Sequence, residues 1–302
     1  MHCLVTGGTG FVGRHLVRRL AQPVVAGRSV GKIKRLLGDV IPCRWDSQTP
    51  LDKNVLDGVE AVFHLAGESV FSGRWNAARK QQIMESRLLG TRNLVASLAG
   101  LDRTPKVLVC ASAIGYYGPS GDALLSEASP PGTDFLARVC QAWEEEARQA
   151  EQLGIRVVSV RIGVVLGSDG GALPRMLLPF RLGLGGRIGS GRQYMSWIHI
   201  DDLVGILLHA ATENSVRGPV NAVAPQAVTN REFTATLAEV LHRPAFLAVP
   251  APVLRITLGE FAEVLLGSQR VVPEKILQSG FAFRHPELKG ALHDLLGKGN
   301  GV

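Results

Sequence analysis

The stretch GGTGFVG at residues 7–13 decides the fold. Its glycines, Gly7, Gly10 and Gly13, follow a short apolar run at the start of the chain and precede a segment with helical spacing. In a dinucleotide-binding loop, one glycine permits a tight turn, one lets the backbone approach the pyrophosphate, and one lets the helix pack close to the strand. The following helix offers backbone N–H groups to the phosphates. The spacing and its context therefore predict a dinucleotide-binding loop rather than a merely flexible turn.

Apolar runs recur along the chain and alternate with longer segments of helical spacing. The runs are continuous, as expected for strands buried on both faces: CLVTG, PVVAG, EAVFHLAG, KVLVCAS and RVVSVRIGVV. This alternation predicts an α/β fold, a doubly wound parallel sheet of Rossmann type with helices on both faces. After Leu166, glycine and proline become frequent, which predicts an irregular region over one end of the sheet.

Composition limits the kinds of partner that we expect. The formal net charge is +7, but the basic residues are scattered and only 6% of the residues are aromatic, so we expect no nucleic acid; an anionic cofactor or substrate explains the excess. The longest apolar stretches are shorter than the roughly 20 residues of a membrane helix, and no export segment is visible. We therefore expect no membrane partner and a cytoplasmic location, with an organelle matrix after trimming as the alternative. The cysteines show no metal-ligand spacing, so we expect no metal: Cys3, Cys43, Cys110 and Cys140.

The second apolar run predicts which dinucleotide is bound. NAD-specific folds carry an acidic residue where this strand ends, whereas NADP-specific folds carry a cation for the extra phosphate. Here the chain reads VVAGRSVGKIKR, with Gly27 followed by Arg28, and a guanidinium can fork a phosphate. Three further cations follow, Lys32, Lys34 and Arg35. The sequence favours NADP(H), although a solvated basic face remains the alternative.

Six motifs follow one another along the chain: GGTGFVG at 7–13, HLAG at 64–67, GTRNL at 90–94, ASAIGYYG at 111–118, RIGVVLG at 161–167 and WIHIDDL at 197–203. Together they resemble the extended short-chain dehydrogenases/reductases, which form the NAD(P)-dependent epimerase/dehydratase superfamily. More closely, the chain is similar to the atypical epimerase branch, with a GESV-like loop followed by RW and a tail of the VVPEKILQSGFAF type. The resemblance covers essentially the whole chain. It implies a Rossmann core at residues 1–167 and a mixed segment at residues 168–302, which holds a smaller substrate lobe and a helical tail and returns some elements to the core.

The resemblance also implies where the cofactor lies. His64 and the three residues after it would lie under its adenosine and pyrophosphate side, and Val164 would line the nicotinamide end. The long crossover helices are where this superfamily often pairs, which makes a homodimer possible. The expected cofactor-binding residues are Gly7, Thr9, Gly10, Phe11, Val12, Gly13, Gly27, Arg28, Leu65, Ala66, Gly67, Gln82, Arg87 and Val164.

One departure from the superfamily pattern concerns the chemistry. The superfamily uses a Tyr and a Lys four residues later, the Lys lowering the pKa of the phenol that exchanges a proton. This chain has three tyrosines and none of them has a lysine at that spacing: Tyr116, Tyr117 and Tyr194. If Glu144 is aligned with the acidic residue that usually follows, the two positions hold Leu136 and Cys140. Arg87 also replaces an Asn of the proton path, so the usual acid/base machinery is absent.

Other side chains are candidates for that work at the carboxyl end of the sheet. Glu68, Tyr116 and Tyr117 follow predicted strands, and the resemblance places the superfamily's catalytic Ser or Thr near Ser112 or Ala113. The candidate catalytic residues are Glu68, Ser112, Tyr116 and Tyr117. The candidate substrate residues are Arg74, Trp75, Arg192 and Gln193. Packing roles for Trp75 and one tyrosine, and an ion pair of Arg74 with Glu68, stay open.

The WIHIDDL motif allows two interpretations. His199 could close over the substrate, or it could start a helix in which Asp201 and Asp202 favour the helix dipole. The helix start is the favoured interpretation.

Two functions fit these observations. The first is an NADP(H)-binding oxidoreductase or epimerase that acts on a small polar carbonyl or hydroxyl compound with nonstandard proton donors. The second is a sensor or scaffold that binds NADPH without turning it over. The missing dyad favours the sensor, and the polar residues near the expected nicotinamide favour the enzyme.

Overall fold

Seven parallel strands form the central sheet of the computed structural model, which describes residues 1–71 and 75–297. All neighbouring strands pair in parallel, and the expected α/β fold of Rossmann type is confirmed. In spatial order the strands are β12 (Gly218–Ala222), β7 (Arg156–Ile162), β5 (Val107–Ala113), β4 (Ala61–His64), β1 (Cys3–Thr6), β2 (Val24–Gly27) and β3 (Ile41–Arg44).

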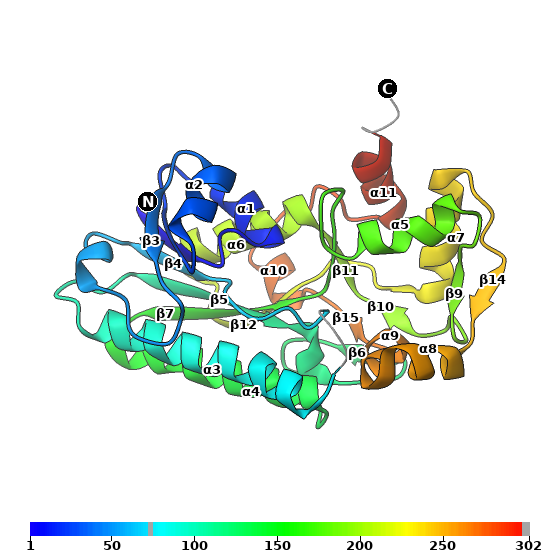
Figure 1. Ribbon diagram of the computed structural model, residues 1–302, viewed down its shortest axis with the longest axis horizontal. Helices are drawn as coiled ribbons and strands as arrows, with labels where there is room; N and C mark the ends of the chain where they lie inside the picture. Colours follow the sequence, from blue (N-terminus) through cyan, green and yellow to red (C-terminus); the bar gives the residue numbers. More distant parts are fainter. Residues whose placement is uncertain (72–74, 298–302) are drawn as a thin grey trace.

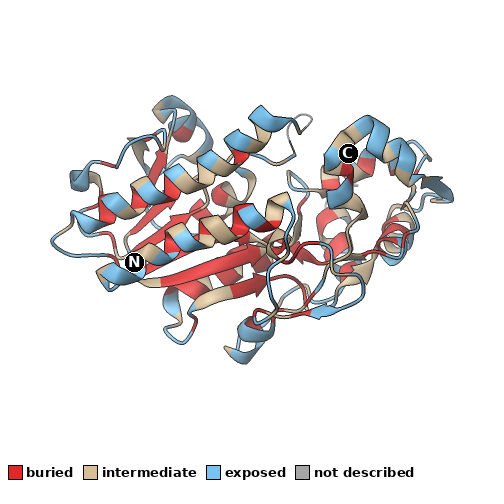
Figure 2. Cartoon of the chain, turned by 90° about the horizontal axis from the view of Figure 1, so that it is seen from below, coloured by how far each residue is buried: buried red, intermediate tan, exposed pale blue. Residues whose placement is uncertain are grey.

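Helices cover both faces of this sheet (Figure 1). One face carries α1 (Phe11–Val17), α2 (Val30–Leu37) and α6 (Ile200–Thr212), and the other carries the long pair α3 (Ala77–Ala99) and α4 (Phe135–Arg148). Neighbouring residues of one strand enter different cores: Leu4 packs with Leu94 and Trp143 on the α3/α4 side, and Val5 packs with Leu207 on the other side. Burial on both faces is why the strands read as continuous apolar runs, and Figure 2 shows the sheet as a buried layer.

Short helical turns connect several of these elements. They are η1 (Lys53–Val55), η2 (Ile114–Tyr117), which follows β5, η3 (Gln149–Leu153), which continues α4, and η4 (Gly259–Phe261). Within residues 1–71 and 75–297, no helix has the length and apolar character needed to cross a bilayer.

Most of the remaining elements form small two-stranded pairings and helices beyond one end of the sheet (Figure 1). α6 and β12 also come after residue 167 but pack in the core, and the division of the chain at that residue stays a prediction. The outlying strands pair as β8 with β11, β9 with β14, β10 with β13, and β6 with β15. Their bounds are β6 Leu124–Leu125, β8 Val164–Leu166, β9 Gly186–Ile188, β10 Tyr194–Met195, β11 Trp197–His199, β13 Val228–Thr229, β14 Leu247–Val249 and β15 Arg270–Val271. The helices are α5 (Leu173–Arg181), α7 (Asn230–Leu241), α8 (Ala251–Leu258), α9 (Ala262–Leu266), α10 (Glu274–Gln278) and α11 (Leu288–Gly297).

Candidate functional site

The glycine loop joins β1 to α1 at the carboxyl edge of the sheet. Gly7 has a φ of +71°, and a Cβ there would lie 2.7 Å from the carbonyl carbon of Leu65 in the loop after β4. A Cβ on Gly13 would overlap the carbonyl oxygen of Gly7. Gly7 therefore serves the turn and the approach of the two loops, and Gly13 serves the packing of α1 on β1. We call the backbone at Gly7 and Gly13 the glycine cradle, because side chains at these two positions would fill the space there.

Phe11 is a packing residue in this structure. A Cβ on Gly167, Gly170 or Gly171 would collide with its ring, so the glycines after β8 make room for it. The glycine-rich composition of that segment thus has a steric cause. A direct contact of Phe11 with a cofactor stays a prediction.

A buried hydrogen-bonded chain holds the loop after β4 against β1. The amide N–H of Ala66 donates to Thr6 Oγ1 at 3.3 Å, and Thr6 Oγ1 lies 2.7 Å from His64 Nδ1. His64 Nε2 lies 3.0 Å from Thr91 Oγ1, whose hydroxyl donates to the carbonyl of Arg87. This order of donors assigns the proton to Nε2. Burial lowers the pKa of His64 to about 4, so the ring is neutral and positions the loop.

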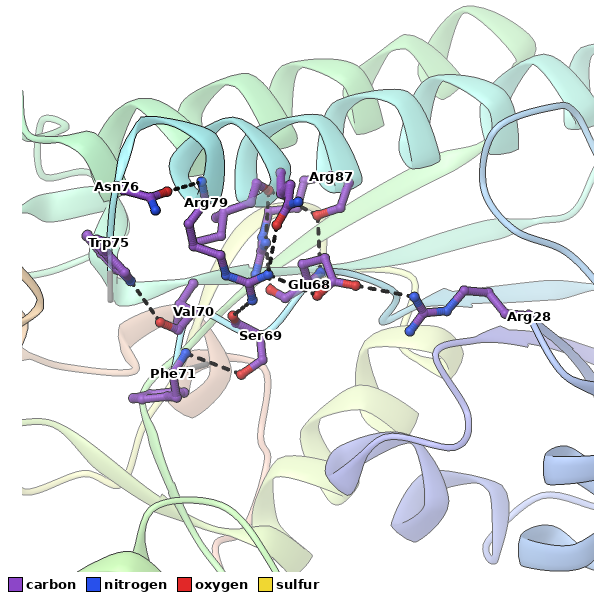
Figure 3. Close-up of polar contacts among 12 residues, drawn as sticks. Arg28, Glu68, Ser69, Val70, Phe71, Trp75, Asn76, Arg79 and Arg87 are labelled. Carbon is purple, nitrogen blue, oxygen red and sulfur yellow. Dashed lines mark hydrogen bonds and ion pairs between the residues drawn. The ribbon is translucent and has the colours of Figure 1, made fainter. Parts of the chain in front are cut away.

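The Glu68 carboxylate lies between the guanidinium groups of Arg28 and Arg79 (Figure 3). Arg28 follows β2, its side chain is 79% exposed, and its Nη1 lies 3.4 Å from Glu68 Oε1. On the other side, Arg79 Nη1 lies 3.4 Å from Glu68 Oε2 and 3.2 Å from Gln82 Oε1. Glu68, expected as a catalytic carboxylate, lies between these two guanidinium groups, and its catalytic role stays a prediction.

Arg87, which lies in α3, supports the same loop after β4. Its Nη1 donates to the carbonyl oxygen of Glu68 at 3.0 Å and to that of Ile83 at 3.1 Å. Its guanidinium lies 4.9 Å from the centre of the Trp143 ring, and a Cβ on Gly67 would lie 3.3 Å from its Cζ. A cation here therefore fixes the loop backbone, and its contact with a cofactor stays a prediction.

Leu136 and Cys140, at the positions where the superfamily has its dyad, face η2. A Cβ on Gly115 would lie 3.3 Å from Leu136 Cβ and 3.9 Å from Cys140 Sγ. Burial raises the pKa of the Cys140 thiol to about 11, so it is protonated and neutral near pH 7. It therefore supplies none of the positive charge by which a lysine lowers the pKa of a phenol.

Ser112 and Tyr117, two candidate catalytic hydroxyl groups, belong to a buried polar network. Ser112 Oγ donates to Glu144 Oε1 at 2.6 Å, and Arg161 binds both oxygens of that carboxylate at 2.9 Å. The Tyr117 hydroxyl donates to Asn221 Oδ1 at 2.7 Å and accepts from Arg161 Nη1 at 3.0 Å. Burial raises the pKa of Tyr117. These contacts join β5, α4, β7 and β12, which is a structural role.

Tyr116 is more accessible. Its ring packs on the guanidinium of Arg161, whose Cζ lies 3.4 Å from the ring centre. Unlike the Tyr117 hydroxyl, the Tyr116 hydroxyl makes no hydrogen bond among the described residues. Tyr116 also lines a cavity of about 530 Å³ between α4 and β12, together with Gln141, Glu144, Arg161 and Pro219. The phenol is therefore available to a ligand.

Two of the residues expected to bind substrate, Arg74 and Trp75, are adjacent in the chain. Trp75 packs edge-on against Phe135 and Phe261, and its Nε1 donates to the carbonyl of Val70, which is the packing role left open by the sequence. Arg74 lies outside the described residues.

Two further residues were expected in the substrate site. Gln193 is buried and donates from Nε2 to the carbonyl oxygens of Ile188 at 3.0 Å and Leu265 at 3.4 Å. Arg192 is exposed, with its backbone N–H on Ser190 Oγ. Val164, expected at the nicotinamide end, lies in β8.

His199 is the N-cap of α6, as the favoured interpretation of WIHIDDL has it. Its Nδ1 accepts the backbone N–H of Asp201 at 3.1 Å, and its ring stacks on His285 with centroids 3.8 Å apart. These three residues are close enough to hold a metal ion. However, the neutral imidazole then carries its proton on Nε2, which faces Asp294 Oδ2 at 3.4 Å and has no lone pair for a metal.

Sequence reasoning missed the segment that holds η2 in place. The Gln269 amide donates to the carbonyl oxygens of Ile114 at 2.9 Å and Gly118 at 3.1 Å, and β15 pairs with β6. The two partners lie about 150 residues apart in the chain, at separations of 155 and 151. No local pattern in the sequence signals such a long-range contact.

Comparison with known proteins identifies the family of the chain. The model of the NAD dependent epimerase/dehydratase family matches residues 3–223, and a domain of unknown function, DUF1731, matches residues 249–295. The epimerase family protein SDR39U1 of Bos taurus is 42% identical over 98% of this chain and 100% of its own length. A chloroplastic homologue from Arabidopsis thaliana is 40% identical over 97% of this chain and 86% of its own length.

Solved structures agree with this assignment. The crystal structure of human SDR39U1 with NADPH has a TM-score of 0.88 and 37% identity, and the match covers 98% of this chain and 99% of that one. UDP-glucuronic acid 4-epimerase from Bacillus cereus shares the fold, with a TM-score of 0.78 at 17% identity over 98% of each chain. The chain belongs to the NAD dependent epimerase/dehydratase family.

Proposed function

We propose that the protein binds NADP(H) and is an oxidoreductase or epimerase-like enzyme for a small polar carbonyl or hydroxyl compound. The observation that carries the cofactor is the combination of the glycine cradle at Gly7 and Gly13 with the exposed guanidinium of Arg28 at the end of β2. In doubly wound folds the dinucleotide lies at this edge, with its 2′-phosphate beside the second strand. The NADPH bound to the human relative supports the same choice.

The residues present fit this cofactor. The backbone of residues 7–13 would receive the pyrophosphate, the loop Leu65–Gly67 would lie under the adenosine side, and Arg28 would fork the 2′-phosphate. A bound nicotinamide supplies hydride donation and acceptance. The chain itself must then place the substrate and move a proton.

Tyr116 is the proposed proton donor. Of the catalytic candidates it alone has a hydroxyl outside the networks that occupy Glu68, Ser112 and Tyr117. The Arg161 guanidinium packs against its ring and holds the phenol in place.

A sensor that binds NADPH without turnover is the second candidate. It is favoured by Leu136 and by the neutral thiol of Cys140, whose pKa is raised to about 11, at the dyad positions. A homodimer through α3 and α4 and a cytoplasmic location stay predictions.

Isotope transfer separates the two candidates. The protein is incubated with NADPH deuterated at the transferable position and a panel of keto sugars, aldehydes and quinones, and the isotope is followed by mass spectrometry. We expect deuterium in one class of compound. Full retention in NADPH that is shown to be bound would favour the sensor.

A matched pair of variants then tests Tyr116. With the substrate found, Tyr116→Phe should lower turnover by about 10²- to 10⁴-fold because proton transfer is lost. Tyr117→Phe is the control and should stay within about tenfold, since its hydroxyl is buried in a structural network. Equal turnover of Tyr116→Phe and the unmodified protein would exclude the phenol as the donor.

A further inference from the structure

Arg28 and Glu68 form an ion pair where the 2′-phosphate of NADP(H) is proposed to bind. Arg28 Nη1 lies 3.4 Å from Glu68 Oε1, and the two side chains come from different strand ends, after β2 and after β4 (Figure 3). Within the described residues this is the carboxylate that Arg28 meets. A carboxylate on a proposed phosphate-binding arginine is unexpected, because it carries the same sign of charge as the ligand.

The two partners are held unequally. The backbone N–H of Glu68 donates to Ser86 Oγ at 3.1 Å, its carbonyl oxygen accepts from Arg87, and its Oε2 faces Arg79 at 3.4 Å. Two of these contacts hold the backbone of Glu68 against α3, and the contact with Arg79 holds its carboxylate. Arg28 is 79% exposed, and in the described part of the chain its guanidinium has Glu68 as its one ion-pair partner. A ligand that claims Arg28 would thus draw it away from a carboxylate that stays in place.

We propose that Glu68 is a specificity-determining residue that competes with the 2′-phosphate for Arg28 and so limits the preference for NADP(H) over NAD(H). This inference rests on the proposed binding of NADP(H). An exposed ion pair is weak, and a phosphate carries more charge and a bidentate acceptor edge, so the phosphate wins Arg28. The fixed carboxylate nevertheless remains beside it and repels it. A cofactor without the 2′-phosphate neither displaces Arg28 nor meets this repulsion.

A double-mutant cycle tests the competition. The dissociation constants of NADPH and NADH are measured by calorimetry at low ionic strength for the unmodified protein, Glu68→Gln, Arg28→Ala and the double variant. Glu68→Gln should tighten NADPH about three- to tenfold and change NADH less than about twofold. In the Arg28→Ala background the same substitution should change the dissociation constant of NADPH less, because the guanidinium for which Glu68 and the phosphate compete is absent.

Glu60→Gln is the matched control for the loss of one negative charge. Glu60 is an exposed carboxylate paired with Lys106 at 3.1 Å, next to the amino end of β4. This variant should leave both dissociation constants unchanged.

Three outcomes overturn the inference. Weaker NADPH binding by Glu68→Gln would mean that the carboxylate orients Arg28 rather than competing for it. Equal tightening of NADPH and NADH would mean a general charge effect. If Arg28→Ala weakens the binding of NADPH and NADH equally, Arg28 does not hold the phosphate and the proposed contact itself fails. The single Arg28→Ala variant shows this independently of the Glu68→Gln variant.

Discussion

At the scale of single residues, His64 makes stability depend on pH. Its folded pKa of about 4 lies below the ordinary value of 6.5, so between these values the unfolded chain binds a proton that the folded chain does not. Stability conferred by the neutral ring is present above pH 6.5 and is lost as the pH falls towards 4. We expect the free energy of unfolding to drop by roughly 2 kcal/mol from pH 8 to pH 5, as measured by urea unfolding.

The geometry gives the reason for the low pKa. Protonation would place a second N–H on Nδ1, where Thr6 already donates, and would bury a charge. His64→Gln is the comparison and should show a shallower slope over the same range. A flat profile in the unmodified protein would contradict the neutral ring. The lowered pKa of His199 acts in the same direction, so the difference between the two slopes is the quantity to compare.

Residues with a backbone requirement were predictable, and residues with long-range partners were not. The sequence predicts the turn at Gly7 and the close packing at Gly13 because each follows from a local strand, loop and helix. The sequence did not predict that the hydroxyl groups of Ser112 and Tyr117 are occupied. Their partners, Glu144 and Asn221, are 32 and 104 residues away in the chain. No local pattern distinguishes an occupied hydroxyl from an available one.

At the scale of elements, the turn η2 depends on the segment around β15. Gln269→Leu removes the two hydrogen bonds to the carbonyl oxygens of Ile114 and Gly118. We expect a loss of roughly 1–3 kcal/mol in the free energy of unfolding and faster amide exchange at Gly118, whose N–H bonds to Gly115 within the turn. Hydrogen exchange followed by mass spectrometry checks both where exchange becomes faster and how large the loss in free energy is.

Gln149→Leu is the control for this prediction. Gln149 lies beyond α4, and its amide bonds Glu145 one turn earlier on the exposed surface. This variant should leave exchange at η2 unchanged. Unchanged exchange in Gln269→Leu as well would mean that the turn holds itself.

The strands and crossover helices of the core were predictable because their periodicity is local, whereas the pairing of β15 with β6 was not. Each of those two strands has two residues, too short for a pattern, and they meet only because the chain has already folded. The same holds for the packing of Trp75 on Phe261, which joins the start of α3 to η4.

At the scale of the whole molecule, the C-terminal tail shares a core with the first strand. Leu292 of α11 and Ile276 of α10 belong to the same buried cluster as Val5 of β1 and Leu207 of α6. The sequence divides the chain at residue 167, but a shared core favours a single cooperative unit over two independent ones. We therefore expect one thermal unfolding transition, with calorimetric and van't Hoff enthalpies equal.

Leu292→Ala tests this unity. Removing a fully buried leucine should cost roughly 2–5 kcal/mol and lower the midpoint of that one transition without splitting it. Because the glycine loop belongs to the same unit, protection of its amides should fall together with that of α11. Leu178→Ala is the control, since that side chain is 63% exposed and its loss should change the midpoint little. A second transition, or a tail that loosens while residues 7–13 keep full protection, would show that the tail folds as a separate unit.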